Sequence, residues 1–187
     1  MSEIIKVGMA DLKTCVSPDG ITTLGLGSCV GIAIRDPVSK VGGLAHIMLP
    51  DSKAIKNGQQ SVAKFADTGI VELVRQMEKL GAKQSRMVAK IAGGATMFTF
   101  QGSGSNIGQV GDRNVEAVKN KLKELKIPIL AEDTGANYGR TVIFYHNGRY
   151  GKRKPYLFKR SGQGDDRKAE AQVRLGVPFH RSEYRRR

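Results

Sequence analysis

The sequence predicts a domain of the α/β class, in its α+β form, in which β-strands are flanked by two helices. Short apolar segments recur along the first 160 residues, and Val30–Arg35 alternates large apolar with small or polar residues, as in a half-buried strand. Two longer segments repeat apolar residues every three or four positions, as in helices that pack one face on a core. A chain of 187 residues is long enough to bury a substantial core, so one domain is expected.

Seven strands are expected, each next to turn residues. They are predicted at Glu3–Met9, Ile21–Leu24, Val30–Arg35, Leu44–Leu49, Met87–Ala92, Ile129–Glu132 and Thr141–His146. Asn147-Gly148 follows the last strand and is a strong hairpin signal, because both residues tolerate positive φ. A closing strand is therefore expected from Arg149 onward, including Tyr156–Phe158.

The two predicted helices each carry one apolar face, which we interpret as a core-packing surface. Gly81 is placed to end the first helix, and Pro128 prevents continuation of the second, which is expected to start near Asp112 as N-cap. The first face comprises Val62, Phe65, Ala66, Gly69, Ile70, Leu73, Val74, Met77 and Leu80, and the second Val115, Val118, Leu122 and Leu125.

A hairpin brings a cysteine and a histidine together. If Arg35 pairs with Lys40 across a four-residue turn at Asp36–Ser39, counting back along the strands places Cys29 opposite His46. Directly opposed residues share a face, with Cβ atoms about 4.5–5.5 Å apart. A five-residue loop would shift the register by one, and a bulge would have to restore the shared face.

The approach to Cys29 suits a nucleophile. Gly25 and Gly27 allow a tight backbone path, and uncovered N–H groups at Gly27 and Ser28 are expected to bind the substrate as an oxyanion hole. Thr23 ends a predicted strand, from which its hydroxyl or carbonyl can hold one imidazole nitrogen. From spacing alone, the alternative is a buried structural cysteine and a structural histidine.

The net charge of +14 is concentrated at the C-terminal end, where the segment from Arg149 onward carries +9 and the preceding body +5. We expect a folded domain over residues 1–160 and a basic, flexible tail over residues 161–187. Such a tail can contact nucleic acid, an anionic membrane or an acidic protein. No stacking or groove-reading motif accompanies it, so a solvated tail is favoured and no nucleic-acid partner is expected.

The N-terminus lacks the form of a secretory signal and no apolar run approaches a membrane span, so a cytoplasmic protein without membrane insertion is expected. Cys15 and Cys29 fit a reduced compartment and offer no disulfide framework. Neither His146 nor His180 has ligand spacing, so no metal is expected.

Two further motifs are interpreted as structural. Gly102–Gly108 departs from the spacing of a nucleotide-binding loop and is predicted to be a surface turn. Asp133-Thr134-Gly135 occurs once, whereas aspartic-protease chemistry needs two carboxylates, so it is predicted to be a strand-to-loop bend.

Several motifs in order resemble the chemoreceptor glutamine deamidase family, CheD, of bacterial and archaeal chemotaxis. The resemblance rests on Thr23, Gly25–Cys29, Asp36-Pro37, His46–Pro50, Lys90–Phe98, Asn106–Gly108, Arg113–Val118 and Ala131–Gly135, and runs from about Ile4 to Tyr150. The chain departs from the family's pattern in an insertion at Gln109–Asp112, in Ala136 and in its long basic extension.

The resemblance implies a fold of packed mixed sheets with flanking helices, related to cysteine deamidase toxins. It implies Cys29 as nucleophile, His46 as general base and Thr23 as the third member of a triad. The implied reaction, without a cofactor, converts receptor glutamine side chains to glutamate and releases ammonia. The implied partners are the cytoplasmic domain of a chemoreceptor and a CheC-type phosphatase.

The residues alone leave two other classes of function open. One is a different Cys–His acyl-transfer enzyme, a protease or a transglutaminase, although threonine in place of Asn or Asp as the orienting residue argues against both. The other is a non-enzymatic basic binding module, for which salt-sensitive nucleic-acid binding would be the signature.

Overall fold

The computed structural model describes residues 3–54, 61–96, 109–145 and 156–161. The described strands are β1 Ile4–Val7, β2 Asp11–Val16, β3 Gly20–Leu26, β4 Val30–Asp36, β5 Val41–Ile47, β6 Val88–Gly93, β7 Ile129–Thr134, β8 Gly139–Tyr145 and β9 Tyr156–Ser161. The α-helices are α1 Ala66–Lys79 and α2 Val110–Glu124, with short 3-10 helices η1 Ser52–Ala54, η2 Val62–Lys64 and η3 Gln84–Arg86.

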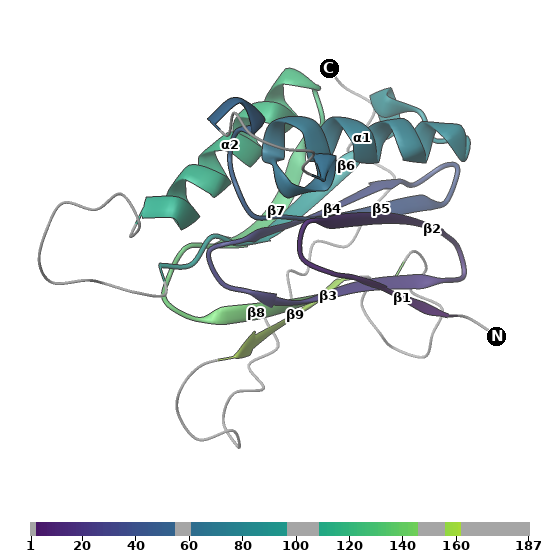
Figure 1. The fold of residues 1–187 in the computed structure, drawn as a ribbon. Coiled ribbons are helices and arrows are strands. Elements are labelled where there is room, and N and C mark those ends of the chain that lie inside the picture. Colours follow the sequence, from purple (N-terminus) through teal and green to yellow (C-terminus); the bar gives the residue numbers. More distant parts are fainter. Residues whose placement is uncertain (1–2, 55–60, 97–108, 146–155, 162–187) are drawn as a thin grey trace, which may run out of the picture.

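Two mixed sheets pack face to face, and both α-helices cover the outer face of the larger sheet (Figure 1). The smaller sheet has the strand order β1-β3-β8-β9, in which β1 and β3 are parallel. The larger sheet has the order β2-β5-β4-β6-β7, in which β6 and β7 are parallel. The predicted class, mixed sheets packed together with flanking helices, is therefore confirmed.

One hydrophobic core lies between the larger sheet and the helices, and a second lies between the two sheets. Ile32 and Ile34 of β4 join Leu73 of α1 in the first core, whereas Ala33 joins Phe144 of β8 in the second. Neighbouring strand residues point to opposite faces, so β4 and β5 are buried along their whole length. Side chains of these two central strands thus have no solvent face.

The predicted strands are present, with ends that differ by at most three residues. The closing strand is also present, since β9 pairs antiparallel with β8. Strand β2 was not predicted. Its two buried side chains, Leu12 and Cys15, are three positions apart and belong to different cores, so the segment has no period-two alternation.

The β4–β5 hairpin has the predicted loop length, but the loop starts one residue later. Asp36 pairs with Val41, which places Gly31 opposite His46. The prediction that Cys29 stands directly opposite His46 is therefore wrong by two residues. Because the shift is even, Cys29 stays on the same face of the sheet as His46.

Asp36 sets this register because its side chain is bound inside the fold. The carboxylate is fully buried and accepts hydrogen bonds from the backbone N–H groups of Val38 at 2.9 Å and Lys83 at 3.0 Å. Burial raises the pKa of Asp36, but the Arg86 guanidinium and these N–H groups outweigh it and hold the pKa well below its usual range. Lys40, with φ of 60°, then closes the loop.

Helix α1 begins later than its apolar stripe, at Ala66. Phe65 is extended (φ −114°, ψ 147°) and bridges to Leu49, while the carbonyl of Lys64 accepts hydrogen bonds from the N–H groups of Met48 and Leu49. The segment before the helix therefore binds the chain that follows β5. Gly81 has φ of 93°, as expected of the residue that ends the helix.

Helix α2 begins at Val110, with Gln109 before it, so the prediction of Asp112 as N-cap is wrong. Asp112 lies inside the first turn instead. An acidic residue is favourable at either place, because both lie at the positive end of the helix dipole. The prediction that this helix ends before Pro128 is confirmed, since α2 ends at Glu124.

The bend predicted at Asp133-Thr134-Gly135 is confirmed, because β7 ends at Thr134 and Gly135 has φ of 74°. The predicted turn at Gly102–Gly108, the turn at Asn147-Gly148 and residues 162–187 of the predicted tail lie outside the described residues. The boundary between domain and tail stays a prediction. Among the helices of the described part, none is both long and apolar enough to cross a membrane.

Candidate functional site

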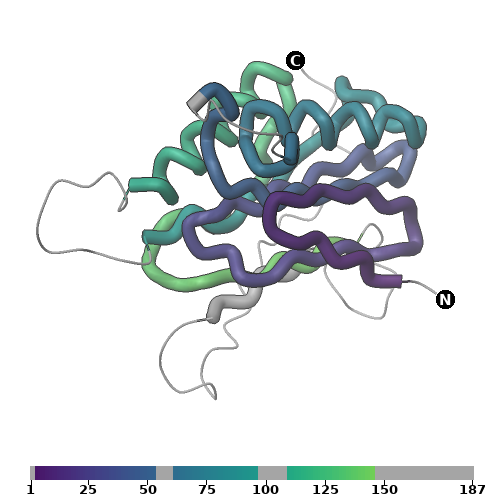
Figure 2. The backbone as a smooth tube through the Cα atoms, in the orientation of Figure 1, coloured from purple at the N-terminus to yellow at the C-terminus, as the bar shows by residue number. Residues whose placement is uncertain are grey.

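The predicted site residues lie at one end of the sandwich, where the chain crosses twice between the sheets. Residues 8–10 connect β1 to β2, and residues 27–29 connect β3 to β4. Figure 2 shows both crossovers at the same end of the fold. The pairing of β2 and β4 with β5 brings Asp11 and Gly31 alongside His46 at this end.

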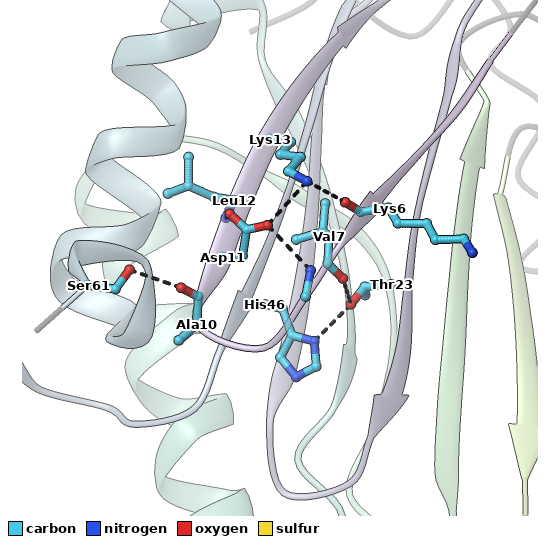
Figure 3. Close-up of polar contacts among 10 residues, drawn as sticks. Lys6, Val7, Ala10, Asp11, Leu12, Lys13, Thr23, His46 and Ser61 are labelled. Atoms are coloured by element: carbon cyan, nitrogen blue, oxygen red, sulfur yellow. Dashed lines mark hydrogen bonds and ion pairs between the residues drawn. The ribbon is translucent and has the colours of Figure 1, made fainter.

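Thr23 and His46 meet between the sheets, as predicted. The Thr23 Oγ1 atom is 2.8 Å from Nδ1 of His46 and 2.9 Å from the carbonyl oxygen of Val7 (Figure 3). Thr23 comes from β3 and His46 from β5, so this contact joins the two sheets. Both side chains are buried, with 1% and 0% exposure.

The contact with Val7 fixes the proton on the imidazole. A carbonyl oxygen can only accept a hydrogen bond, so the Thr23 hydroxyl donates its single proton to Val7. Nδ1 of His46 must then donate to Thr23, which leaves Nε2 of the neutral ring without a proton. Nε2 is buried and has no hydrogen-bond partner within the described residues, so it is available as a base.

Glycine at position 31 allows β3 to pack closely over this pair. Gly31 stands opposite His46, and a Cβ atom there would lie 2.9 Å from the side chain of Leu26 and 3.5 Å from the methyl group of Thr23. A larger side chain would displace Leu26 and press on Thr23. The small residue thus preserves the position of the hydroxyl that holds His46.

Cys29 lies next to β4 on the face that carries His46. It precedes Val30, which pairs with Ile47, so it is a diagonal neighbour of His46 instead of its direct partner. Cys29 is half-buried and packs against the core between the sheets. Cys15, in contrast, is 3% exposed, and burial raises its pKa to about 12.

Burial sets the resting charges of both groups. It lowers the pKa of His46, and it raises the pKa of Cys29 against a smaller lowering effect of the Cys29 backbone N–H. Both shifts favour the neutral form. The pair therefore rests near neutral pH as a thiol and a neutral imidazole.

The loop before Cys29 has the conformation predicted for it only in part. Gly25 has φ of 71°, and its carbonyl accepts a hydrogen bond from the N–H of Gly27 at 3.0 Å. Gly27 does not have positive φ, and because its N–H is used in this hydrogen bond, the prediction that it is uncovered for substrate binding is wrong. The carbonyl oxygens of Gly27 and Cys29 accept hydrogen bonds at 2.8 Å from the N–H groups of Ala95 and Gly94.

Gly93 permits the close approach behind the cysteine. It has φ of 116°, and a Cβ atom at this position would lie 2.1 Å from the carbonyl oxygen of Cys29. Any side chain would therefore displace Cys29 or distort β6.

Asn114 of α2 also belongs to this region and was missed by the sequence analysis. Its side chain is fully buried and its Nδ2 atom is 2.9 Å from the carbonyl oxygens of Ser28 and Met48. The available signal was its spacing, since Asn114 lies four and eight residues before the buried Val118 and Leu122. A polar residue on the apolar face of a helix is expected to be buried and hydrogen-bonded.

Known proteins match this chain over most of its length. A family model described as CheD chemotactic sensory transduction matches residues 48–151. A relative from Lachnoclostridium phytofermentans, named "Probable chemoreceptor glutamine deamidase CheD", is 63% identical over 144 residues, which cover 77% of this chain and 88% of the relative. The chain belongs to the CheD family.

Other CheD relatives agree with this assignment. One from Syntrophomonas wolfei with the same name is 56% identical, and one from Halalkalibacterium halodurans, named "Chemoreceptor glutamine deamidase CheD", is 53% identical, each with the same coverage. A solved structure, a Neisseria meningitidis protein of the DUF152 family, aligns with 76% of this chain and 74% of its own at 8% identity and a TM-score of 0.47. The matched range of the CheD family model begins after His46 and contains Asn114.

Proposed function

We propose that this CheD-family chain is a protein-glutamine deamidase that converts glutamine side chains of chemoreceptors to glutamate and releases ammonia. The names of its relatives support the reaction and the substrate. The observation that carries the proposal is the hydrogen bond from Nδ1 of His46 to Thr23, because it leaves Nε2 free to accept a proton on the face that carries Cys29.

In the first step His46 takes the thiol proton of Cys29 while the sulfur attacks the carboxamide carbon of glutamine. Diagonal neighbours in an antiparallel pair have Cα atoms about 7–8 Å apart, a gap that a cysteine and an imidazole side chain can close. The carboxamide oxygen becomes an oxyanion, which we assign to the N–H groups of Ser28 and Cys29, because the N–H of Gly27 is bound to the Gly25 carbonyl. The imidazolium then protonates the leaving nitrogen, ammonia departs and a thioester remains.

In the second step His46 removes a proton from water, and the resulting hydroxide attacks the thioester carbon. The carbon–sulfur bond breaks, Cys29 regains its proton from the imidazolium, and glutamate is left on the receptor. These two side chains and water supply the whole reaction, so the proposal includes no cofactor. Each turnover adds one negative charge to the receptor surface.

The proposed partners are those that the resemblance to the CheD family implies. The substrate is the cytoplasmic part of a chemoreceptor, which places this protein in the cytoplasm. A CheC-type phosphatase is proposed as a second partner. The proposal includes neither nucleic-acid binding nor membrane insertion.

Incubation of a receptor cytoplasmic fragment with the wild-type protein tests the function. We expect ammonia release and peptides whose mass rises by about one dalton at glutamine, as read by tandem mass spectrometry. Backbone cleavage would point instead to a protease, and incorporation of an added primary amine would point to a transglutaminase. Unchanged receptor, together with salt-sensitive binding of nucleic acid, would support the basic binding module.

Two adjacent threonines provide a matched test of the His46 tautomer. Thr22 and Thr23 are both buried, and each hydroxyl donates to a backbone carbonyl, but only Thr23 contacts His46. We expect Thr23→Val to lower kcat about 100-fold or more, because the imidazole loses the acceptor that orients it. Thr22→Val loses a comparable hydrogen bond and should retain activity within about threefold. Equal activity of the two variants would contradict a role for Thr23 in holding His46.

A further inference from the structure

Three successive carbonyl groups of the cysteine loop are held from one side. Those of Gly27 and Cys29 accept hydrogen bonds from backbone N–H groups at the end of β6, as described above. The carbonyl between them, on Ser28, is held by the side chain of Asn114. Of these three contacts with the loop, only the middle one can therefore be removed by a side-chain substitution.

The direction of these carbonyls sets the direction of the N–H groups. In a planar trans peptide the C=O and the following N–H point in opposite directions. With the Ser28 carbonyl turned toward α2, the N–H of Cys29 points away from α2. This N–H also lowers the pKa of the Cys29 thiol of its own residue, an effect that is smaller than that of burial.

The orientation of the Asn114 amide follows from its partners. Both contacts of its outer atom are with carbonyl oxygens, those of Ser28 and Met48, so this atom must be the NH₂ group with both protons in use. Ser28 precedes Cys29, and Met48 lies two residues after His46. The one amide thus joins the chain next to the nucleophile to the chain next to the base.

The other end of the amide shows that the value of Asn114 lies in its NH₂ group. Oδ1 of Asn114 is buried without a hydrogen-bond partner in the described part of the chain, although the side chain is fully buried. Leaving a buried acceptor unpaired is unfavourable for stability. An apolar residue at this position would avoid this cost. The stabilisation that Asn114 provides therefore comes from the two hydrogen bonds that its NH₂ group donates.

We infer that Asn114 is a positioning residue that fixes the Ser28–Cys29 peptide with its N–H aimed at the oxyanion of the reaction. The inference rests on the proposed deamidase function. Asn114 touches neither the thiol nor the substrate and acts through the peptide that it holds. Its removal should therefore weaken stabilisation of the tetrahedral intermediate while leaving the thiol in place.

Two substitutions test this role. Asn114→Asp keeps the shape but turns an oxygen toward two carbonyls, and Asn114→Leu removes the donors without that repulsion and suits the buried site. Asn120→Asp is the matched control, since Asn120 is exposed on the same helix. We expect both Asn114 variants to lower kcat about 100-fold, with KM within about threefold, as for loss of one oxyanion donor. The control should keep wild-type kcat.

Alkylation of Cys29 by iodoacetamide separates positioning from unfolding, because that reaction develops no carbonyl oxyanion. In variants shown by thermal melting to be folded, the alkylation rate should stay within about threefold of wild type. An unchanged kcat would overturn the inference. A kcat that falls only as much as the alkylation rate of Cys29, or only as much as the folded fraction of the variant, would overturn it as well. If the wild-type protein itself leaves the receptor unmodified, the proposed function fails instead.

Discussion

Replacing Cys29 with alanine is expected to abolish receptor deamidation and to leave the fold intact. The proposed thioester cannot form without the sulfur, so the rate should fall by about 10⁴-fold or more, to the background of the assay. Cys29 is only half-buried and belongs to a loop, so the loss of one atom should change the melting temperature little. The measurement is the rate of glutamine-to-glutamate conversion with a receptor fragment.

Cys15 supplies the control for this substitution. Cys15→Ala removes the other thiol of the chain, which lies between the sheets and away from the predicted site residues. We expect this variant to keep its activity and to lose about 1 kcal/mol of stability through the small cavity. In the wild-type protein iodoacetamide should label Cys29 alone, because the thiolate reacts and Cys15, with its pKa of about 12, stays protonated. Deamidation that survives Cys29→Ala would exclude the covalent mechanism.

The sequence was sufficient to propose the residues of the candidate site, because they lie in segments with local sequence signals. Apolar segments next to turn residues predicted the strands that carry Thr23 and His46, and glycines indicated the loop before Cys29. Alternation also fixed which residues share a face. The prediction that Thr23 holds an imidazole nitrogen is confirmed by its hydrogen bond with His46, whereas the placement of the two residues in different sheets was not predicted.

The register of the β4–β5 hairpin could not be predicted, because it depends on contacts distant in sequence. Asp36 looks like the first residue of a turn, since aspartate followed by proline favours turns. Its burial and its hydrogen bonds with the chain near Lys83 and Arg86 keep it in the strand. No local pattern shows that a carboxylate will find a partner about fifty residues later.

Asn114 shows a second limit of sequence analysis. The role of a buried amide depends on the groups to which it is hydrogen-bonded. The partners of Asn114 are the carbonyl groups of Met48 and Ser28, which lie 66 and 86 residues earlier in the chain. Side-chain type and helical phase can mark such a residue as unusual. Only the fold shows that it faces the cysteine loop.

Replacement of His46 by asparagine is expected to lower kcat about 1000-fold, within the range attributed to general acid–base catalysis. The asparagine amide can still donate to Thr23 in place of Nδ1, but it has no basic atom in place of Nε2. The variant therefore removes the proposed base and keeps the hydrogen bond that orients it. The wild-type and His46→Asn rates should be compared with the same receptor fragment.

The pH dependence gives an independent measure of the same residue. Burial lowers the pKa of His46, so the neutral base persists below the ordinary histidine value of about 6.5. The kcat/KM of the wild type should accordingly fall on acidification with a midpoint below about pH 6.5, and this limb should be absent from His46→Asn. A wild-type midpoint above that value, or the same limb in the variant, would contradict His46 as the base.

Acidification also acts on the fold, and the two effects must be separated. Because the folded-state pKa of His46 lies below its unfolded-state value, the unfolded chain binds more protons below about pH 6.5, and stability is lost as the pH falls. Enzyme held at the lowest pH and assayed after return to neutral pH should recover full activity if only the base has been protonated. Recovery of the rate excludes irreversible unfolding, and melting curves at each pH exclude reversible unfolding. The fall of kcat/KM at acidic pH then reports protonation of Nε2 in His46.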